Sequence, residues 1–208
     1  MGMIRFASLT VPMLLAACGG ASLPNTAAPN EAATAETVVN QGEAADGIMA
    51  APADATTPLL NLAPEALSLV DPQTGRAREL AFGTARALTV TGATAALGKP
   101  SDTGRNEECG EGAMEFVEFG GLTLWFQQDK FVGWFLDGAK PKLTTATGAG
   151  IGSTRKQVAD ALTISDVPDS SLGREFATDK GDFSGLLDGA GDGAKVTALW
   201  SGQTCIFR

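Results

Sequence analysis

Residues 113–136 have the sequence Ala-Met-Glu-Phe-Val-Glu-Phe-Gly-Gly-Leu-Thr-Leu-Trp-Phe-Gln-Gln-Asp-Lys-Phe-Val-Gly-Trp-Phe-Leu. This stretch contains three runs rich in aromatic and branched residues, the types that favour strands: Ala113–Phe119, Leu122–Gln127 and Lys130–Leu136. Two residues separate each run from the next, Gly120-Gly121 and Gln128-Asp129, which is the length of a tight hairpin connection. We therefore predict an antiparallel three-stranded meander at the centre of the fold.

Most of the chain's aromatic residues lie in or near this meander, which allows two interpretations. Aromatic side chains crowd binding interfaces, but alternating residues of an antiparallel meander more often form its core. We predict a core role for the cluster and keep the three tryptophans of the chain as candidates for contacts with a partner. The cluster comprises Met114, Phe116, Trp125, Phe126, Phe131, Trp134 and Phe135, and the interaction candidates are Trp125, Trp134 and Trp200.

Towards the N-terminus, the pattern indicates a hairpin and then a helix. Ala66–Val70 and Arg76–Ala81 alternate with period two and flank the turn residues Asp71–Gly75, which predicts a β-hairpin. The next segment, Ala85–Leu97, is followed by Gly98, as expected for a helix that ends there.

Towards the C-terminus, the same order of elements is predicted again. Thr154-Arg155-Lys156-Gln157 fits the S/T-x-x-Q capping box, so a second helix is expected to begin there and to end before Pro168. Strands are then expected at Phe183–Leu187, Lys195–Ser201 and Thr204–Phe207. Gly189–Gly193 is expected to be the loop that joins the first two of them.

These elements predict an α+β fold, with an antiparallel sheet and two helices, over residues 59–208. Since a helix followed by antiparallel strands occurs twice, the segment is expected to be either one domain or two tandem helix-plus-meander units, 59–140 and 141–208.

Two short motifs resemble parts of a known helix motif. Gly152-Ser153-Thr154, with Val158 and Ala161-Leu162 after it, resembles the opening of the helix in the small barrel-assembly lipoproteins (BamE/SmpA-like). Leu97-Gly98-Lys99-Pro100 resembles the end of the same motif, so each predicted unit has one half of it. Tandem modules of this shape also occur in secreted β-lactamase inhibitor proteins. The resemblance implies tandem α+β modules and does not specify a function.

The start of the chain has the features of a secretory signal. Arg5 precedes a short apolar segment, Phe6–Leu15, which is too short to span a membrane. The segment ends in Leu15-Ala16-Ala17-Cys18, which resembles the lipobox of bacterial lipoproteins. That resemblance implies that residues 1–17 are removed and that Cys18 receives the acyl chains.

The residues after the cysteine predict a tether and a location. Residues 18–58 are dominated by Ala, Thr, Asn, Pro, Gly and acids, and they contain no Lys, Arg or aromatic residue. Because this composition cannot bury enough apolar surface to form a core, we expect a disordered tether. Gly19 follows Cys18, which resembles the outer-membrane sorting pattern, so the folded part is expected at the periplasmic face of the outer membrane.

The overall composition excludes several classes of function. The formal net charge is −9, and removal of Arg5 with the signal makes it −9 − 1 = −10, which is unsuited to nucleic acid. The chain contains no His, so neither Ser-His-Asp nor Cys-His catalysis is available. No spacing of acids or thiols matches a metal site, and the Gly-rich stretch at 148–153 lacks the features of a nucleotide loop, so neither metal nor cofactor is expected.

Two cysteines, Cys109 and Cys205, lie in the predicted folded part. In an oxidising compartment, an even number of cysteines in a small domain usually indicates a disulfide. The alternatives are a metal ligand or a reactive thiol, but a reactive thiol needs a basic setting, and Glu107, Glu108 and Glu111 surround Cys109. We therefore predict that the two cysteines are joined.

Two hypotheses of function remain. In the first, the protein is a non-catalytic binding or scaffolding lipoprotein that contacts an envelope protein or peptidoglycan. In the second, it is a small envelope hydrolase that uses carboxylates, since two acids suffice for glycoside chemistry. The candidate acids are Glu107, Glu108, Glu111 and Asp137, but the sequence does not show any two of them converging. The first hypothesis is favoured.

The lipobox predicts a specific N-terminus for the mature protein. Mass spectrometry of protein isolated from bacterial membranes is expected to find Cys18 as the first residue, with a diacylglycerol thioether and an acylated amino group. An unmodified Cys18, or a chain that keeps Met1, would exclude the lipid anchor.

Overall fold

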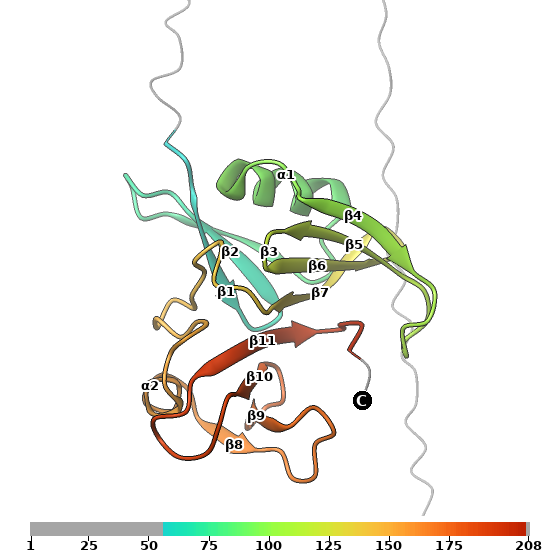
Figure 1. Cartoon of the computed structure of the whole chain (residues 1–208). Coiled ribbons are helices and arrows are strands. Elements are labelled where there is room, and N and C mark those ends of the chain that lie inside the picture. Colours follow the sequence, from blue (N-terminus) through green and yellow to red (C-terminus); the bar gives the residue numbers. More distant parts are fainter. Residues whose placement is uncertain (1–55, 207–208) are drawn as a thin grey trace, which may run out of the picture. The chain divides into compact units, whose positions relative to one another are not determined.

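A computed structural model describes residues 56–206 of the chain, which form two antiparallel sheets and two helices (Figure 1). The predicted α+β class is therefore confirmed. The predicted signal and nearly all of the predicted tether, up to residue 55, lie outside the described residues.

The smaller sheet has three strands in the order β1-β2-β3: Leu59–Ala63, Ala66–Val70 and Ala77–Ala81. The predicted hairpin is confirmed, since β2 and β3 pair antiparallel. In the turn between them, the Asp71 carboxylate accepts hydrogen bonds from the backbone N–H groups of Gln73 and Thr74. These hydrogen bonds lower the pKa of Asp71 from its ordinary value, because they stabilise the charged form.

The helix that follows, α1 (Arg86–Leu97), confirms the first predicted helix. Its middle is rich in threonine, which is not a strong helix former. Thr89 and Thr91 use their hydroxyl groups to donate to backbone carbonyls one turn earlier, so these polar groups are satisfied within the helix. Gly98 ends the helix with a φ of 85°, a conformation that glycine adopts without strain.

The predicted meander is confirmed as β5 (Met114–Phe119), β6 (Leu122–Gln127) and β7 (Lys130–Leu136), preceded by β4 (Asp102–Asn106). Both connections of the meander are tight. Gln128 and Asp129 adopt φ of 51° and 59°, as a two-residue hairpin turn with two left-handed residues requires.

The second half repeats this order. The capping box at Thr154 is present and starts α2 (Arg155–Ala161), which is followed by four antiparallel strands. These strands are β8 (Ile164–Asp166), β9 (Arg174–Thr178), β10 (Ser184–Leu187) and β11 (Val196–Gly202). The eight strands form one sheet in the order β4-β5-β6-β7-β11-β10-β9-β8, so the last strands of the two halves are paired at its centre.

Some expectations from the sequence need correction. Thr204–Phe207 was expected to be a strand, but residues 204–206 follow β11 without secondary structure, and Phe207 lies outside the described residues. The sequence also did not predict β1, β4, β8 and β9. Among these, β4 is a polar edge strand (Asp-Thr-Gly-Arg-Asn) and β8 has three residues, so neither shows the apolar alternation that marks a half-buried strand.

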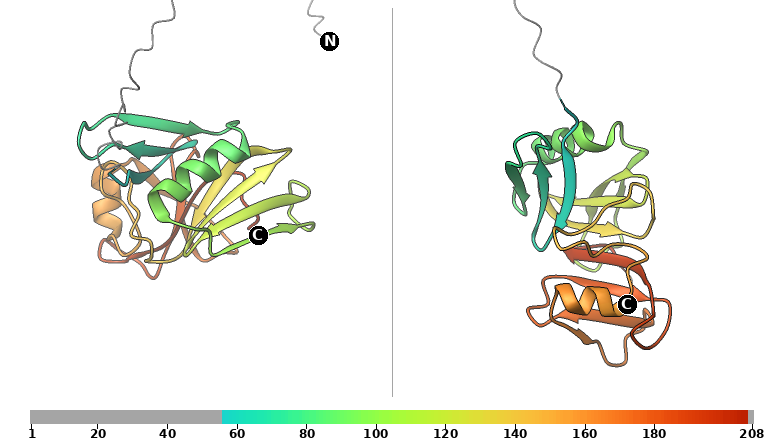
Figure 2. Two further views of the ribbon diagram at one scale, coloured as in Figure 1. Left: turned by 90° about the horizontal axis from the view of Figure 1, so that it is seen from above. Right: turned by 90° about the vertical axis from the view of Figure 1, so that its left-hand side faces the viewer.

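One face of the large sheet, called here the core face, forms most of the hydrophobic core. Val117, Leu124, Trp134 and Leu199 point to this face, together with other buried residues of the strands. Residues of the three-stranded sheet and of both helices belong to the same core. Figure 2 shows α1 and the small sheet next to the first half of the large sheet, and α2 next to the second half.

A disulfide between Cys109 and Cys205 joins the β4–β5 loop to the segment after β11, with an S–S distance of 2.07 Å. The segment crosses the sheet at Gly133 of β7, where the Gln203 N–H donates to the Val132 carbonyl. A Cβ atom at Gly133 would lie 2.0 Å from the Gln203 carbonyl oxygen, so only glycine allows this approach. Residues 203–206 are called the C-terminal strap below.

The disulfide predicts a large loss of stability on reduction. Its loop spans 96 residues, for which the chain-entropy model gives about 4–5 kcal/mol. In urea unfolding monitored by tryptophan fluorescence, the double variant Cys109→Ala/Cys205→Ala is expected to lose much of this amount. Cys18→Ser, outside the loop, serves as the control and is expected to unfold as wild type. Peptide mapping under non-reducing conditions should recover Cys109 and Cys205 in one linked peptide, and free thiols at both positions would contradict the structure.

The packing of the strap on β7 predicts a second stability effect. Gly133→Ala places a methyl group against the Gln203 backbone and is expected to destabilise the fold by about 1–3 kcal/mol, the usual cost of overpacking. At Gly189, a Cβ atom meets nothing within 4 Å, so Gly189→Ala is the matched control and is expected to be nearly neutral. Equal midpoints of urea unfolding for the two variants would show that the strap does not constrain β7.

Candidate functional site

The large sheet has a second face, opposite the core face, on which neither α1 nor α2 packs; it is called the open face here. Side chains alternate between the two faces along each strand, and cross-strand partners share a face. Phe116 pairs with Trp125, and Phe135 pairs with Trp200, so all four lie on the open face. Their ring centroids are 5.7 Å apart in the first pair and 6.1 Å apart in the second.

These four residues are called the aromatic patch. Phe116, Trp125 and Phe135 are partly exposed, while Trp200 is 5% exposed. The C-terminal strap lies beside the patch, because Gly133, which the strap covers, is the cross-strand neighbour of Trp125. A cavity of about 290 Å³ next to Trp200 is lined by Glu111, Gln203 and other residues of the loop and strap.

The three tryptophans proposed from the sequence therefore have different environments. Trp134 is on the core face and is fully buried, and its indole N–H donates to the Ala63 carbonyl at 3.1 Å. It is a core residue, so its assignment as an interaction candidate is wrong. Trp200 is on the open face but mostly buried, and Trp125 is the most accessible of the three.

Phe116 and Phe135 were predicted to be core residues, but they are partly exposed on the open face. The alternation along β7 contains the signal: Trp134 and Phe135 are adjacent and must point to opposite faces. The side of the sheet that the helices cover was not known from the sequence.

Trp125 has an unusual hydrogen-bonding state. Its indole Nε1 atom is buried and has no hydrogen-bond partner among the residues that the structure describes. A buried donor without an acceptor costs about 1–3 kcal/mol, and such groups are uncommon in folded proteins. The patch thus contains a polar group whose hydrogen-bonding capacity is not used within residues 56–206.

Acidic side chains lie next to the aromatic patch on the open face. Asp102 of β4 and Glu118 of β5 are directly opposite each other, and Glu118 is two residues from Phe116 on the same face. Neither carboxylate has an ion-pair partner within the described part of the chain. Directly opposed like charges repel, so this end of the open face favours the approach of cations.

Of the acids proposed for a hydrolase, Asp137 lies far from the other three. Glu107, Glu108 and Glu111 are exposed in the β4–β5 loop, and Glu107 pairs with Arg105, which raises the pKa of the Arg105 guanidinium. Asp137 follows β7 at its other end, and the seven residues of this strand span roughly 20 Å at about 3.3 Å per residue. This is more than the separation of about 5–10 Å that a pair of glycosidase carboxylates needs.

No group of three or more His, Cys, Asp or Glu side chains suited to a metal ion occurs within residues 56–206. In the same range, no helix is long and apolar enough to cross a membrane.

In comparisons with known proteins, no family model, no curated protein and no solved structure matches this chain. The relation to lipoproteins and to tandem α+β modules therefore stays a prediction from short sequence motifs.

Proposed function

We propose that this protein is a non-catalytic binding module of the bacterial cell envelope, held at the membrane by acyl chains on Cys18. Its open face is the contact surface, and its partner is an envelope protein that presents Lys or Arg side chains around an apolar centre.

The aromatic patch is the observation that supports this proposal most directly. Tryptophan and phenylalanine are enriched in the energetically dominant parts of interfaces, because they bury a large area at a low cost in conformational entropy. The patch lies on strands of the central sheet, so its side chains are held in place before a partner arrives, which lowers the entropic cost of binding.

Charge supports a basic partner. The chain has a net charge of −9, and Asp102 and Glu118 place two carboxylates without ion-pair partners in the described range beside Phe116. Arginine and lysine side chains of a partner relieve the repulsion between these carboxylates, and an Arg guanidinium also stacks favourably on Trp125 or Phe135. Long-range attraction between oppositely charged surfaces increases the association rate.

The predicted tether fits this role. As a random coil, about 40 residues have an r.m.s. span of roughly 35 Å, so the folded part reaches partners away from the lipid surface. A polybasic patch for lipid headgroups is not needed when the acyl chains supply the membrane affinity.

The open face can be tested in a pull-down from solubilised envelope with the full-length protein. Trp125→Ala removes an aromatic anchor and is expected to reduce capture of a specific partner at least about tenfold. Glu118→Gln removes a charge that attracts a basic partner and is expected to reduce capture at least about threefold. Capture by wild type is expected to fall with added salt. Leu88→Ala is the matched control, because Leu88 is a 53% exposed apolar residue of α1, away from the open face.

Two outcomes would contradict the proposal. Equal loss of capture with Leu88→Ala and Trp125→Ala would show that the contact is not made by the open face. In a parallel peptidoglycan digestion assay, turnover that a single Glu→Gln change in the β4–β5 loop abolishes would instead support the hydrolase hypothesis.

A further inference from the structure

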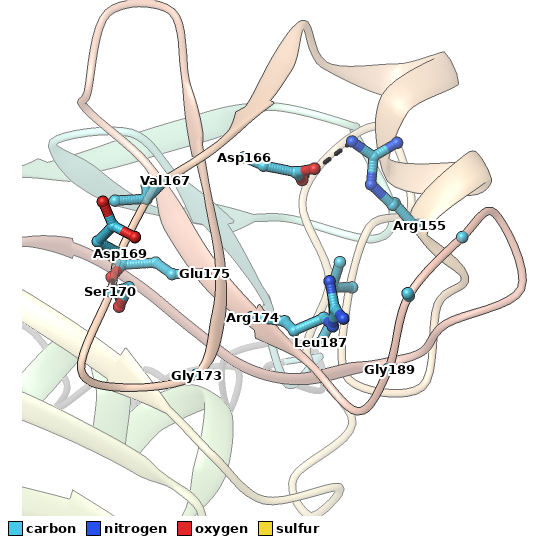
Figure 3. A pocket seen from close by; sticks show the side chains of 12 residues that line it. Arg155, Asp166, Val167, Asp169, Ser170, Gly173, Arg174, Glu175, Leu187 and Gly189 are labelled. Carbon is cyan, nitrogen blue, oxygen red and sulfur yellow. Dashed lines mark hydrogen bonds and ion pairs between the residues drawn. The ribbon is translucent and has the colours of Figure 1, made fainter.

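The second half of the molecule contains a cavity with a volume of about 590 Å³ (Figure 3). It lies between α2, the loop that joins β8 to β9 and the Gly-rich loop that joins β10 to β11. Ligand sites for small molecules commonly have volumes of about 300–1,000 Å³. The cavity is therefore large enough for a small ligand.

Two arginines and one aspartate form one end of this cavity. Arg155, the first residue of α2, extends to Asp166 at the end of β8, with Nη2 to Oδ1 at 3.0 Å. The Arg155 side chain is 25% exposed, and its backbone N–H is fixed by the Ala194 carbonyl. Only one nitrogen of the guanidinium is used by Asp166, so the other N–H groups can bind a further acceptor.

Arg174 provides the second cation. It starts β9 and is the cross-strand partner of the buried Leu187, so it lies on the core-face side of the sheet, next to α2. No ion pair joins Arg174 to any other residue in the range 56–206. Its charge is thus not neutralised by the described part of the protein.

The opposite end of the cavity is anionic. Figure 3 shows Asp169 and Ser170, from the β8–β9 loop, on the side away from Arg155 and Arg174. Ser170 donates its hydroxyl hydrogen bond to the buried carboxylate of Glu175 at 2.6 Å. Asp169, in contrast, is exposed and has no ion pair with a described residue, so it is the acceptor available at this end.

We propose that this cavity binds a small zwitterion with a free carboxylate and a free ammonium group, such as an amino acid or a short peptide. The ligand carboxylate binds Arg174 and the unused N–H groups of Arg155, and its ammonium group binds Asp169. Guanidinium groups suit carboxylates because they donate two parallel hydrogen bonds.

The mixture of charges favours a zwitterion over other small ions. A phosphate ester or a dicarboxylate without an ammonium group would be repelled by Asp166 and Asp169, and a diamine would be repelled by the two arginines. The residues that line the cavity differ from those of the aromatic patch, so this inference is independent of the partner proposed for the open face.

Lys156 is the cation next to Arg155 in the sequence, at the start of α2. Lys156 pairs with Asp160 one turn later, which raises the pKa of Lys156, and it does not line the cavity. The second cation of the site is Arg174, which is nineteen positions after Arg155 and adjacent only in the fold.

The test uses NMR titration of the isotope-labelled full-length protein with alanine, dialanine and trialanine, each also as the N-acetylated and the C-amidated form. At least one of the three free zwitterions is expected to give saturable shifts at residues of the three elements around the cavity. Acetylation or amidation is expected to weaken that binding at least tenfold. The variants Arg174→Ala and Asp169→Asn are each expected to weaken binding of the free zwitterion at least tenfold. The NMR signals of the core residues are expected to stay unchanged in both variants.

Lys180→Ala is the matched control, because Lys180 is an exposed cation of the same half that does not line the cavity, and it is expected to bind as wild type. Three results would overturn the proposal: no saturable shift with any free peptide, equal affinity for free and capped forms, or equal weakening by Lys180→Ala and Arg174→Ala.

Discussion

The pairing of β7 with β11 is the constraint on which the rest of the structure depends. It joins the last strand of each half, places Leu199 beside Leu136 in the core, and sets Trp200 beside Phe135 on the other face. The eight-stranded sheet is continuous only through this pair. Because strands alternate their side chains between two faces, one register here fixes both the core and the aromatic patch; a slip by one residue would exchange them.

The disulfide and the C-terminal strap act on the same region. Cys205 follows β11, and its bond to Cys109 ties the end of the central strand to the β4–β5 loop on the other side of the meander. The strap passes over Gly133, where the absence of a side chain lets two backbones approach each other. Covalent closure and close backbone packing thus limit the relative movement of the strands that present Trp125 and Trp200.

The two faces of the sheet have separate chemical characters. The open face combines aromatic rings with carboxylates that have no ion-pair partner among residues 56–206, a combination that suits a protein partner with cationic side chains. The cavity of the second half combines Arg155 and Arg174 with aspartates, a combination that suits a small ligand. The proposed partner surface and the proposed ligand cavity are lined by different residues, so the two proposals can be tested separately.

The sequence alone determined the elements with local signals: the meander through its alternation, and the helices through Gly98 and the Thr154 capping box. The pairing of Cys109 with Cys205 was predicted from the even number of cysteines and the predicted oxidising compartment. It did not determine the edge strand β4 or the three-residue β8, since polar edge strands lack alternation. Only the tertiary structure decided which of the two residues Trp134 and Phe135 is buried, and that Arg155 and Arg174 line the same cavity. The physical reason is that alternation fixes relative orientation along one strand, while the packing of distant helices and strands decides which face meets solvent.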